Sequence, residues 1–205
     1  MTRTPRRPQP ATGNDEPAVT SVARTPSGMT DPVVRRIRPA DTARMRALRL
    51  EMLADSPLAF LESLAAAAEL PHAHFATRVA WHSHGPSAAQ FIAEDGGPAA
   101  NRTGAGPRFV GHVGGHALAD EPAVTVIFAV YLTPAHRGTG LLAPLIEAVA
   151  AWSRAAGRPE LLLEVVVGND RAVRAYQRLG FIDTGVRMPH PVLPTLTELQ
   201  MRRPA

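Results

Sequence analysis

The sequence predicts an α/β (α+β) protein with a mixed, mostly antiparallel central sheet of about six to seven strands and flanking helices. Three observations support this fold class. Apolar residues recur at helical spacing early in the chain, as in TARMRALRLEMLADS. Two β-rich runs follow, FVGHVGGHAL and AVTVIFAVYL, and the short connection from Ala119 to Pro122 indicates an antiparallel hairpin. Towards the C-terminus, a buried-type strand, a helix and another strand form one crossover.

Composition divides the chain into a tail and one domain. Residues 1–32 are rich in Pro, Thr, Ser and Arg and lack aromatic residues, so they cannot bury enough surface to offset the entropy of ordering. We expect them to form a flexible tail. Residues 33–205 are expected to form a single globular domain, because the chain has 205 residues of which 45% are hydrophobic.

The first half of the domain begins with a short strand and continues with three helical stretches. Asp41 is expected to cap the first helix and Pro57 to end it. A Gly/Pro-rich loop at residues 96–108 closes this half. In order, the expected elements are a strand at Val33 to Pro39, the helix TARMRALRLEMLADS, a helical stretch through FLESLAAAAEL, a helix around His74 to Trp81 and a strand at Gln90 to Asp95.

The second half contains the hairpin, a glycine loop that leads into a helix, and three further strands. In order after the hairpin, the expected elements are the glycine loop with its helix to about Ala156, a strand at Glu160 to Val167, a helix at Asp170 to Leu179, the strand GFIDTG and the strand TLTELQMRR.

Composition also excludes several classes of site. The chain has no cysteine, which excludes disulfides, thiolate metal sites and a catalytic cysteine. All 22 basic residues are arginines, so a lysine-based phosphate loop or Schiff base is impossible. The net charge is only +4 and no basic cluster is interleaved with aromatic residues, so we expect no nucleic-acid partner.

Membrane and metal partners are not expected either. No apolar run approaches the ~20 residues needed to cross a bilayer, and the N-terminus has no apolar signal region, which favours a cytoplasmic location. Several histidines come in close pairs without a carboxylate or cysteine in a recognisable ligand pattern, and we interpret them as surface helix and strand residues. These pairs are His72/His74, His82/His84 and His112/His116.

A glycine-rich segment lies between an apolar strand and an amphipathic helix, in VYLTPAHRGTGLLAPLIEAV. Its residues Arg137-Gly138-Thr139-Gly140 stand just before the helix. Glycines let the backbone approach a ligand closely, and the free N–H groups of a helix start carry the positive end of the helix dipole. The usual occupant of such a site is a phosphate group.

The glycines alone leave more than one interpretation. A Walker A loop requires a lysine, which the chain lacks. Gly138 to Ala143 matches the dinucleotide fingerprint G-x-G-x-x-A, and Glu164 follows at a tolerable distance. That fingerprint normally opens its domain, however, and only 62 residues follow Ala143. A plain glycine-rich turn is the remaining alternative.

A second pattern lies downstream, in LLLEVVVGNDRAVRAYQRLGF. Asn169 follows the strand, Tyr176 comes seven residues later, and Leu179-Gly180-Phe181 ends the helix. Together with Leu132-Thr133-Pro134 and the loop Arg137 to Leu142, this pattern resembles the bacterial type of the Gcn5-related N-acetyltransferase (GNAT) superfamily.

The resemblance runs from about Val33 to Arg203. The family's pyrophosphate loop has the form R/Q-x-x-G-x-G/A. Leu142 departs from it, because the family usually has Gly or Ala at that position, and a side chain there could crowd the pyrophosphate.

The resemblance implies the GNAT fold, whose sheet is split between its two central parallel strands, and acetyl-CoA as the cosubstrate with no metal. Arg137 would be the first residue of the pyrophosphate loop. Asn169 would form a hydrogen bond with the pantetheine, start the next helix, or do both. A bulge would splay the strand end, and the N–H of Leu132 would face the thioester oxygen. The implied cofactor-binding backbone comprises Val130, Tyr131 and Leu132 for the pantetheine arm and Gly138, Thr139, Gly140, Leu141, Leu142 and Ala143 for the pyrophosphate.

The implied activity is direct transfer of an acetyl group to an amine in a ternary complex. Glu164 matches the position of a general base in some family members, although it could also serve a polar network at the sheet split. Tyr176 is placed to protonate the leaving thiolate, since a phenol has a pKa of about 10. The alternative for Tyr176 is a core tyrosine that shares a helix face with Val173.

The acceptor is not specified by any motif. A cationic amine could be attracted by four carboxylates, which could equally form a solvated face: Glu51, Asp55, Glu62 and Glu198. A lysine of another protein, a polyamine and a drug-like amine are all compatible. The alternative function is an acetyl-CoA-binding sensor without efficient catalysis. We expect a monomer or homodimer.

Overall fold

The computed structural model describes residues 32–96 and 107–205. Nearly all of the expected tail lies outside the described residues, and so does most of the loop expected at residues 96–108. Within the described part of the chain, no helix is long and apolar enough to cross a membrane.

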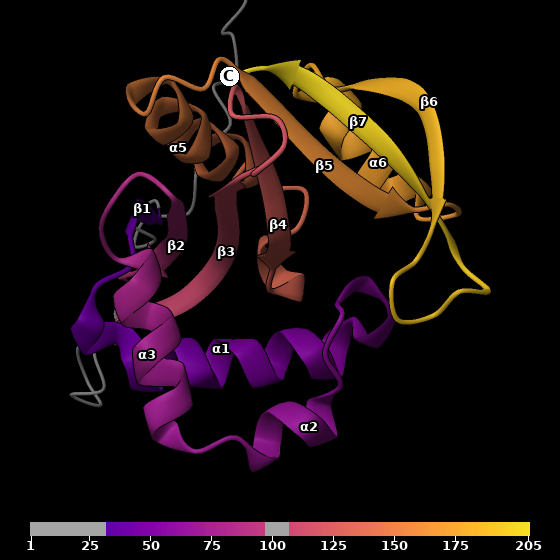
Figure 1. Ribbon diagram of the computed structural model, residues 1–205. Coiled ribbons are helices and arrows are strands. Elements are labelled where there is room, and N and C mark those ends of the chain that lie inside the picture. Colours follow the sequence, from indigo (N-terminus) through magenta and orange to yellow (C-terminus); the bar gives the residue numbers. More distant parts are fainter. Residues whose placement is uncertain (1–31, 97–106) are drawn as a thin grey trace, which may run out of the picture.

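One seven-stranded sheet forms the centre of the molecule, with the strand order β1-β2-β3-β4-β5-β7-β6 (Figure 1). Every neighbouring pair is antiparallel except β4 and β5, which run parallel. This confirms the predicted mixed, mostly antiparallel sheet. It also disfavours a dinucleotide-binding fold, which is built on a mostly parallel sheet. The strands are β1 (Val33–Arg36), β2 (Ala88–Asp95), β3 (Arg108–Ala117), β4 (Val124–Leu132), β5 (Glu160–Val166), β6 (Ile182–Pro189) and β7 (Thr197–Pro204).

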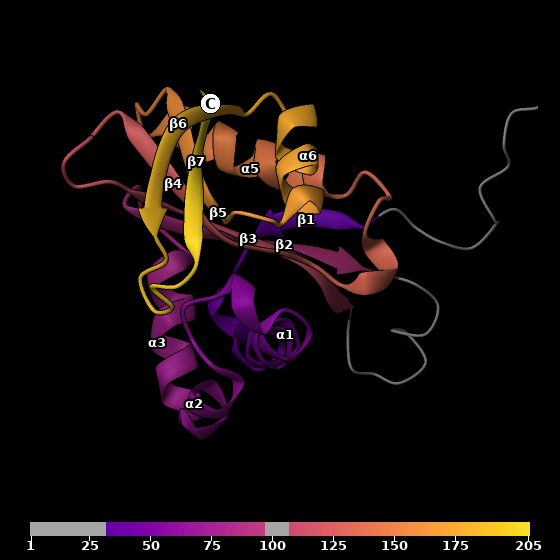
Figure 2. The same cartoon turned by 90° about the vertical axis from the view of Figure 1, so that its right-hand side faces the viewer.

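Helices cover both faces of the sheet. Among the helices of the described residues, the three that precede β2 lie on one face and the two that follow β4 lie on the other (Figure 2). They are α1 (Thr42–Asp55), α2 (Leu64–Glu69), α3 (His72–His82), α5 (Leu142–Ala155) and α6 (Asp170–Arg178), with short 3₁₀ turns at Pro39–Asp41, Pro57–Ala59 and Pro134–His136.

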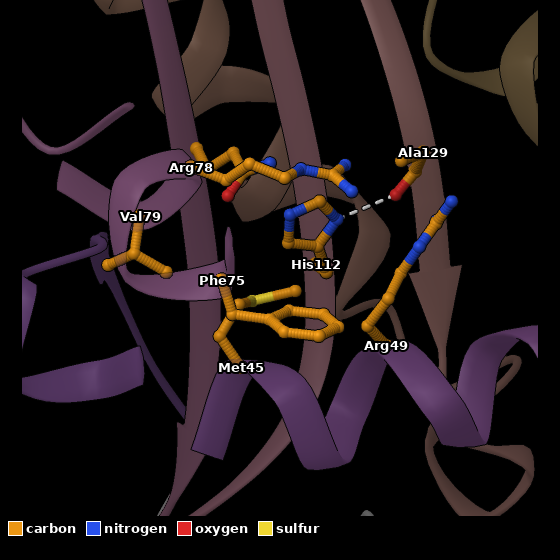
Figure 3. A pocket seen from close by; sticks show the side chains of 8 residues that line it. Met45, Arg49, Phe75, Arg78, Val79, His112 and Ala129 are labelled. Carbon is orange, nitrogen blue, oxygen red and sulfur yellow. Dashed lines mark hydrogen bonds between the residues drawn. The ribbon is translucent and has the colours of Figure 1, made fainter. Parts of the chain in front are cut away.

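Two apolar cores follow from this layering. The larger core joins α5 and α6 to the sheet and includes Leu145, Leu163 and Phe181. The smaller one joins α1 and α3 to the other face. His112 from β3 belongs to this second layer, where it lines a small cavity with Met45, Phe75 and other residues (Figure 3).

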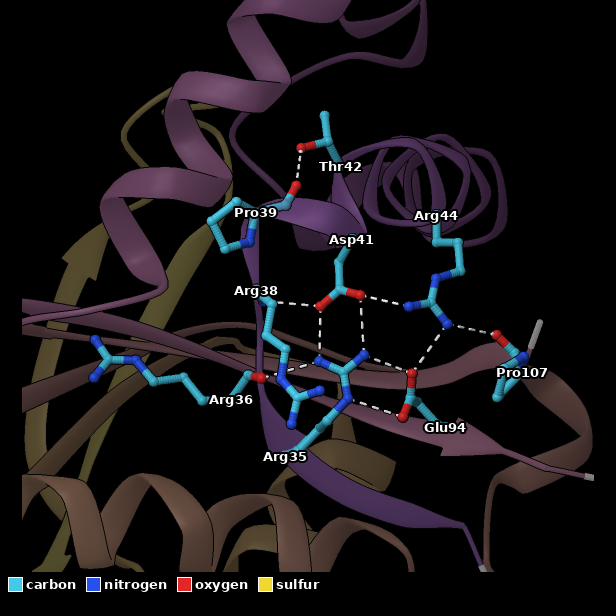
Figure 4. A network of polar contacts seen from close by, with 9 residues as sticks. All are labelled: Arg35, Arg36, Arg38, Pro39, Asp41, Thr42, Arg44, Glu94 and Pro107. Atoms are coloured by element: carbon cyan, nitrogen blue, oxygen red, sulfur yellow. Dashed lines mark hydrogen bonds and ion pairs between the residues drawn. The ribbon is translucent and has the colours of Figure 1, made fainter. Parts of the chain in front are cut away.

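The cap expected from Asp41 is wrong in its chemistry. Asp41 stands at the N-cap position of α1, but its side chain makes no capping hydrogen bond. Instead, the carboxylate accepts two hydrogen bonds from Arg35, at 2.7 and 2.9 Å, one from Arg44, and one from the backbone N–H of Arg38, at 2.8 Å (Figure 4). Both arginines also pair with Glu94 on β2. The carboxylate therefore closes the short turn before α1 and, through its charge-assisted hydrogen bonds to the two arginines, joins β1, α1 and β2.

The strand expected at residues 180–185 begins later and extends further than predicted. Gly180 has φ +86° and belongs to the turn after α6. The strand β6 then continues to Pro189, because its register with β7 resumes after an irregularity between Asp183 and Arg187.

Candidate functional site

The two parallel strands separate in the middle of the sheet. They are matched only from Val124 to Val126 on β4 and from Glu160 to Leu162 on β5. Further along, β5 continues to pair with β7, and β4 continues to pair with β3. The ends of β4 and β5 diverge (Figure 1). We call this divergence, after Val126 and Leu162, the split.

A bulge in β4 lies at the split. The register between β3 and β4 shifts between His112 and Gly114, so Ala129 and Val130 together face the single residue Val113. Ala129 has φ +51°. The structure therefore contains the bulge expected just before Leu132.

The glycine loop forms the connection from β4 to α5. Gly138 and Gly140 have φ +77° and +91°, conformations that side-chain-bearing residues rarely adopt, and both are exposed. The Thr139 hydroxyl donates to the His136 carbonyl at 2.8 Å, which closes the turn. The Ala143 N–H donates to the Gly140 carbonyl at 3.1 Å, so this donor serves the loop itself.

Leu141 and Leu142 turn the loop into α5. Leu141 is buried in the larger core. Leu142, the first residue of α5, is half-buried and packs against the same core. Its side chain thus has an apolar surface to cover.

Arg137 ties the glycine loop to two other elements. Its Nε donates to the Leu132 carbonyl at 3.1 Å, and its guanidinium forms an ion pair with Asp55 at the end of α1. The guanidinium also lies 5.7 Å from the centre of the Tyr131 ring. Arg137 is therefore bound to protein groups on three sides.

Tyr131 lies on the α1 side of β4. Its ring belongs to the smaller core, and its hydroxyl has no hydrogen-bond partner among the described residues. Burial, with the carboxylates of Asp55 and Glu51 nearby, raises the pKa of this hydroxyl.

The helix α6 carries the two downstream motif residues. Asn169 is its N-cap, and its Oδ1 accepts from the Ala172 N–H at 3.3 Å, so the expected helix-starting role is present. Tyr176 is buried in the larger core with its ring edge on to Phe181 at 5.8 Å. Burial raises the pKa of the Tyr176 hydroxyl, which keeps it protonated at neutral pH.

Glu164 lies on the opposite face of the sheet from Tyr176. Its neighbours Leu163 and Val165 face the larger core, so alternation along β5 directs Glu164 to the other side. On β7, Glu198 is matched with Val166 and therefore shares the face of Glu164. Burial and the charge of Glu198 both raise the pKa of the Glu164 carboxyl.

His190, which was not predicted as a site residue, lies beside the Glu198 carboxylate. It is 2% exposed in the β6–β7 connection, and its Nδ1 accepts hydrogen bonds from the N–H groups of Val192 and Leu193, at 3.2 and 3.0 Å. The ring proton is therefore on Nε2, which lies 3.9 Å from a carboxylate oxygen of Glu198. The only sequence signal was one histidine in a proline-rich loop.

The carboxylates expected to attract an amine differ in their partners. Glu51 pairs with Arg108 at 2.8 Å. Glu62 pairs with Arg49 at 2.9 Å. Asp55 pairs with Arg137, as described. Among the described residues, neither Glu164 nor Glu198 has an arginine partner.

The paired histidines do not form a metal site within residues 32–96 and 107–205, where no group of three His, Cys, Asp or Glu could hold a metal ion. The interpretation of all six as surface residues is wrong for His112, which is 1% exposed. Sequence alone offered little warning, because His112 lies in a glycine-rich strand whose packing depends on α1 and α3.

Comparisons with known proteins agree with this architecture. A family model described as the acetyltransferase (GNAT) family matches residues 55–181. A mycothiol acetyltransferase from Corynebacterium glutamicum is 42% identical over 61 residues, which is 30% of this chain. The match spans only 21% of that relative.

Two solved structures illustrate the likeness in fold. A GNAT-family acetyltransferase from Streptococcus pneumoniae superposes with a TM-score of 0.68 at 17% identity, over 85% of this chain and 99% of that one. The Salmonella typhimurium protein yncA, solved with its cofactor acetyl-CoA, gives 0.64 at 16% identity, over 85% and 94% of the two chains.

Proposed function

The chain belongs to the acetyltransferase (GNAT) family, and on that premise we propose that it is an N-acetyltransferase that moves the acetyl group of acetyl-CoA directly to an amine. The observation that carries this proposal is the loss of pairing between β4 and β5 beyond Val126 and Leu162. It leaves the end of β4 without a matched partner in β5, beside a glycine loop at the start of α5, so one extended ligand could contact both.

The pyrophosphate of acetyl-CoA would lie on the glycine loop. Gly138, Thr139 and Gly140 are exposed, and α5 places the positive end of its dipole behind them. Since Arg137 already pairs with Asp55, the loop would bind phosphate mainly through backbone N–H groups. The packing of Leu142 against the core supports a loop that its side chain does not crowd.

The pantetheine arm would lie along the end of β4. The backbone of Val130 to Leu132 would pair with the amides of the arm, and the side-chain amide of Asn169 would provide a further donor. The N–H of Leu132 would stabilise the negative charge that develops on the thioester oxygen.

The acceptor amine would enter on the face that carries Glu164 and Glu198. These two carboxylates have no arginine partner among the described residues. A cationic amine would therefore supply a positively charged partner for them. The raised pKa of the Glu164 carboxyl makes its carboxylate a stronger base for this step. Glu164 would take a proton from the ammonium, and the amine nitrogen would then attack the thioester carbon.

Tyr176 would act from the other face of the sheet. As the new C–N bond forms and the C–S bond breaks, its hydroxyl would donate a hydrogen bond to the departing thiolate. Burial keeps this phenol protonated, which supports a role as donor. Attack and departure would thus be assisted from opposite faces of the sheet.

The acceptor class follows from the two carboxylates, Glu164 and Glu198, that have no arginine partner among the described residues. A protonated primary amine fits them, and both a lysine of another protein and a polyamine carry one. Protein acceptors can be tested without background from enzyme lysines, because all 22 basic residues of this chain are arginines.

Release of free thiol from acetyl-CoA tests the proposal. The assay compares spermidine, a lysine peptide and the same peptide with norleucine in place of lysine, with the acetylated product identified by mass. We expect thiol release with a cationic amine and none with norleucine. Tight acetyl-CoA binding without thiol release for any amine would instead favour a sensor without efficient catalysis.

A further inference from the structure

His112 is a buried histidine with a defined partner at the split. Its Nδ1 lies 2.7 Å from the carbonyl oxygen of Ala129 (Figure 3). A carbonyl can only accept, so the proton of the neutral ring is on Nδ1. Burial lowers the pKa of His112 to about 4, with the charges of Arg49 and Arg78 acting in the same direction, so the ring is neutral at physiological pH.

The other ring nitrogen confirms that the imidazole has one dominant contact. Nε2 is buried and has no hydrogen-bond partner among the described residues. It belongs to a ring that lines a cavity of about 20 Å³ with Arg49, Arg78 and Gln90. The Nδ1–H bond to Ala129 is therefore the polar contact that fixes the ring.

Ala129 is held in a strained conformation. Among the described residues it is the only one other than glycine with a positive φ, +51°. In this conformation the Cβ of an L-residue crowds the backbone. Ala129 and Val130 also have no matched partner in β5 and share Val113 on β3, so ladder pairing gives this segment little support.

The direction of one N–H group depends on this contact. In a planar trans peptide, the carbonyl of one residue and the N–H of the next point in opposite directions, and the described residues contain no cis peptide. Since His112 draws the Ala129 carbonyl towards the layer of α1 and α3, the Val130 N–H points away from that layer.

We propose that His112 is a positioning residue for acetyl-CoA: its hydrogen bond to the Ala129 carbonyl holds the strained 129–130 peptide in the orientation that presents the Val130 N–H to the pantetheine arm. This inference rests on the proposed function, because Val130 belongs to the backbone assigned to the arm.

Substitutions of His112 separate positioning from packing. Asparagine keeps an N–H donor close to the place of Nδ1, whereas leucine fills the core without one. We expect His112→Leu to weaken acetyl-CoA binding by about tenfold or more, and His112→Asn to restore most of that affinity although it packs worse. If leucine binds as well as asparagine or better, the hydrogen bond has no positioning role.

A glycine at position 129 gives an independent readout that a packing role would not change. Glycine adopts positive φ without strain, so the peptide should need less support from His112. We therefore expect His112→Leu to cost clearly less affinity in an Ala129→Gly background than in the wild-type background. Equal losses in the two backgrounds would overturn the proposal.

Calorimetry with acetyl-CoA on the full chain measures all five proteins (the wild type, the two His112 variants, Ala129→Gly and the double variant), and circular dichroism verifies that each is folded. If a variant fails to fold, ¹⁵N shifts of the imidazole in the wild type still test the bond, since they report which nitrogen carries the proton. A proton on Nε2 would overturn the proposal. Absence of acetyl-CoA binding by the wild type would overturn the proposed function as well, whereas the other negative results would remove only the role of His112.

Discussion

Val126 on β4 and Leu162 on β5 are the last matched pair of the two parallel strands at the centre of the sheet. Past this pair, β5 remains attached to β7 as far as the match between Val166 and Glu198. One side of the split is thus the paired strands β5, β7 and β6, which carry the carboxylates of Glu164 and Glu198, and the other is the bulged end of β4. Under the proposed function, this asymmetry would give the cofactor arm and the acceptor amine separate surfaces.

Gly140→Asp should weaken acetyl-CoA binding by at least about tenfold. The substitution adds strain at φ +91° and a negative charge where the pyrophosphate is expected to lie. Calorimetry measures the affinity. Gly185→Asp is the matched control, because Gly185 also has positive φ, +82°, and open space around it, but lies on β6. Equal weakening by both substitutions would show that the phosphates do not lie on the glycine loop.

Glu198→Gln should shift the pH dependence of turnover. Glu164 must lose its proton to act as a base, so turnover rises with pH through its pKa. Burial and the charge of Glu198 both raise that pKa, and removal of the charge leaves only burial. The acidic limb of the profile should therefore move to lower pH. Glu160→Gln, on the same face of β5 but paired with Arg202 at 3.2 Å, should leave the limb in place. If the acidic limb does not move in Glu198→Gln, the ionisation of Glu164 does not control turnover.

Glu164→Gln should lower turnover by about a hundredfold, the scale of a lost general base. Steady-state kinetics with a saturating amine measures it. Near-normal turnover at neutral pH would assign proton removal to water.

Tyr176→Phe should lower turnover by roughly tenfold or more while the KM for acetyl-CoA stays nearly constant. The hydroxyl is proposed to act only as the thiolate departs, so it contributes little to ground-state binding. Parallel measurement of turnover and KM distinguishes the two effects. A higher KM with unchanged turnover would make Tyr176 a binding residue.

His112 should make stability depend on pH. A histidine in an unfolded chain has a pKa of about 6.5, whereas burial lowers that of His112 to about 4 in the folded protein. Between these values the unfolded state binds a proton that the folded state does not, so stability falls as pH falls, by up to about 1.4 kcal/mol per pH unit.

The asparagine variant isolates this contribution, because it lacks the titrating group. Urea unfolding at about pH 7.5, 6 and 5 should show the wild type losing stability relative to His112→Asn below pH ~6.5. A difference that does not change with pH would contradict burial of a neutral ring.

The fold was predictable from sequence because its signals are local. Helical periodicity before Pro57, the hairpin turn at Ala119 to Pro122 and the apolar strand from Glu160 each act over a few residues. The glycine loop was equally predictable, since the positive φ values of Gly138 and Gly140 strongly favour glycine. The prediction that Asp41 caps α1 failed because the Asp41 carboxylate pairs with Arg35 instead. Arg35 also pairs with Glu94, which is distant in sequence, so a local pattern could not reveal this arrangement.

The finer features of the candidate site depend on contacts between distant segments. The contact of His112 with Ala129 requires the register shift between β3 and β4. The shared face of Glu164 and Glu198 requires the pairing of β5 with β7 rather than with β6. The ion pairs that occupy Glu51, Asp55 and Glu62 depend on how α1 and the following turn pack. No short sequence pattern encodes these relationships.

The location of acetyl-CoA is the central claim, and amide hydrogen exchange with and without acetyl-CoA tests it most directly. The full chain is compared alone, with acetyl-CoA and with NAD. We predict slower exchange at Val130 to Leu132 and at Gly138 to Leu142 with acetyl-CoA, no change in β6, and no effect of NAD. Slowing by NAD at the glycine loop, or slowing by acetyl-CoA confined to other segments, would contradict it.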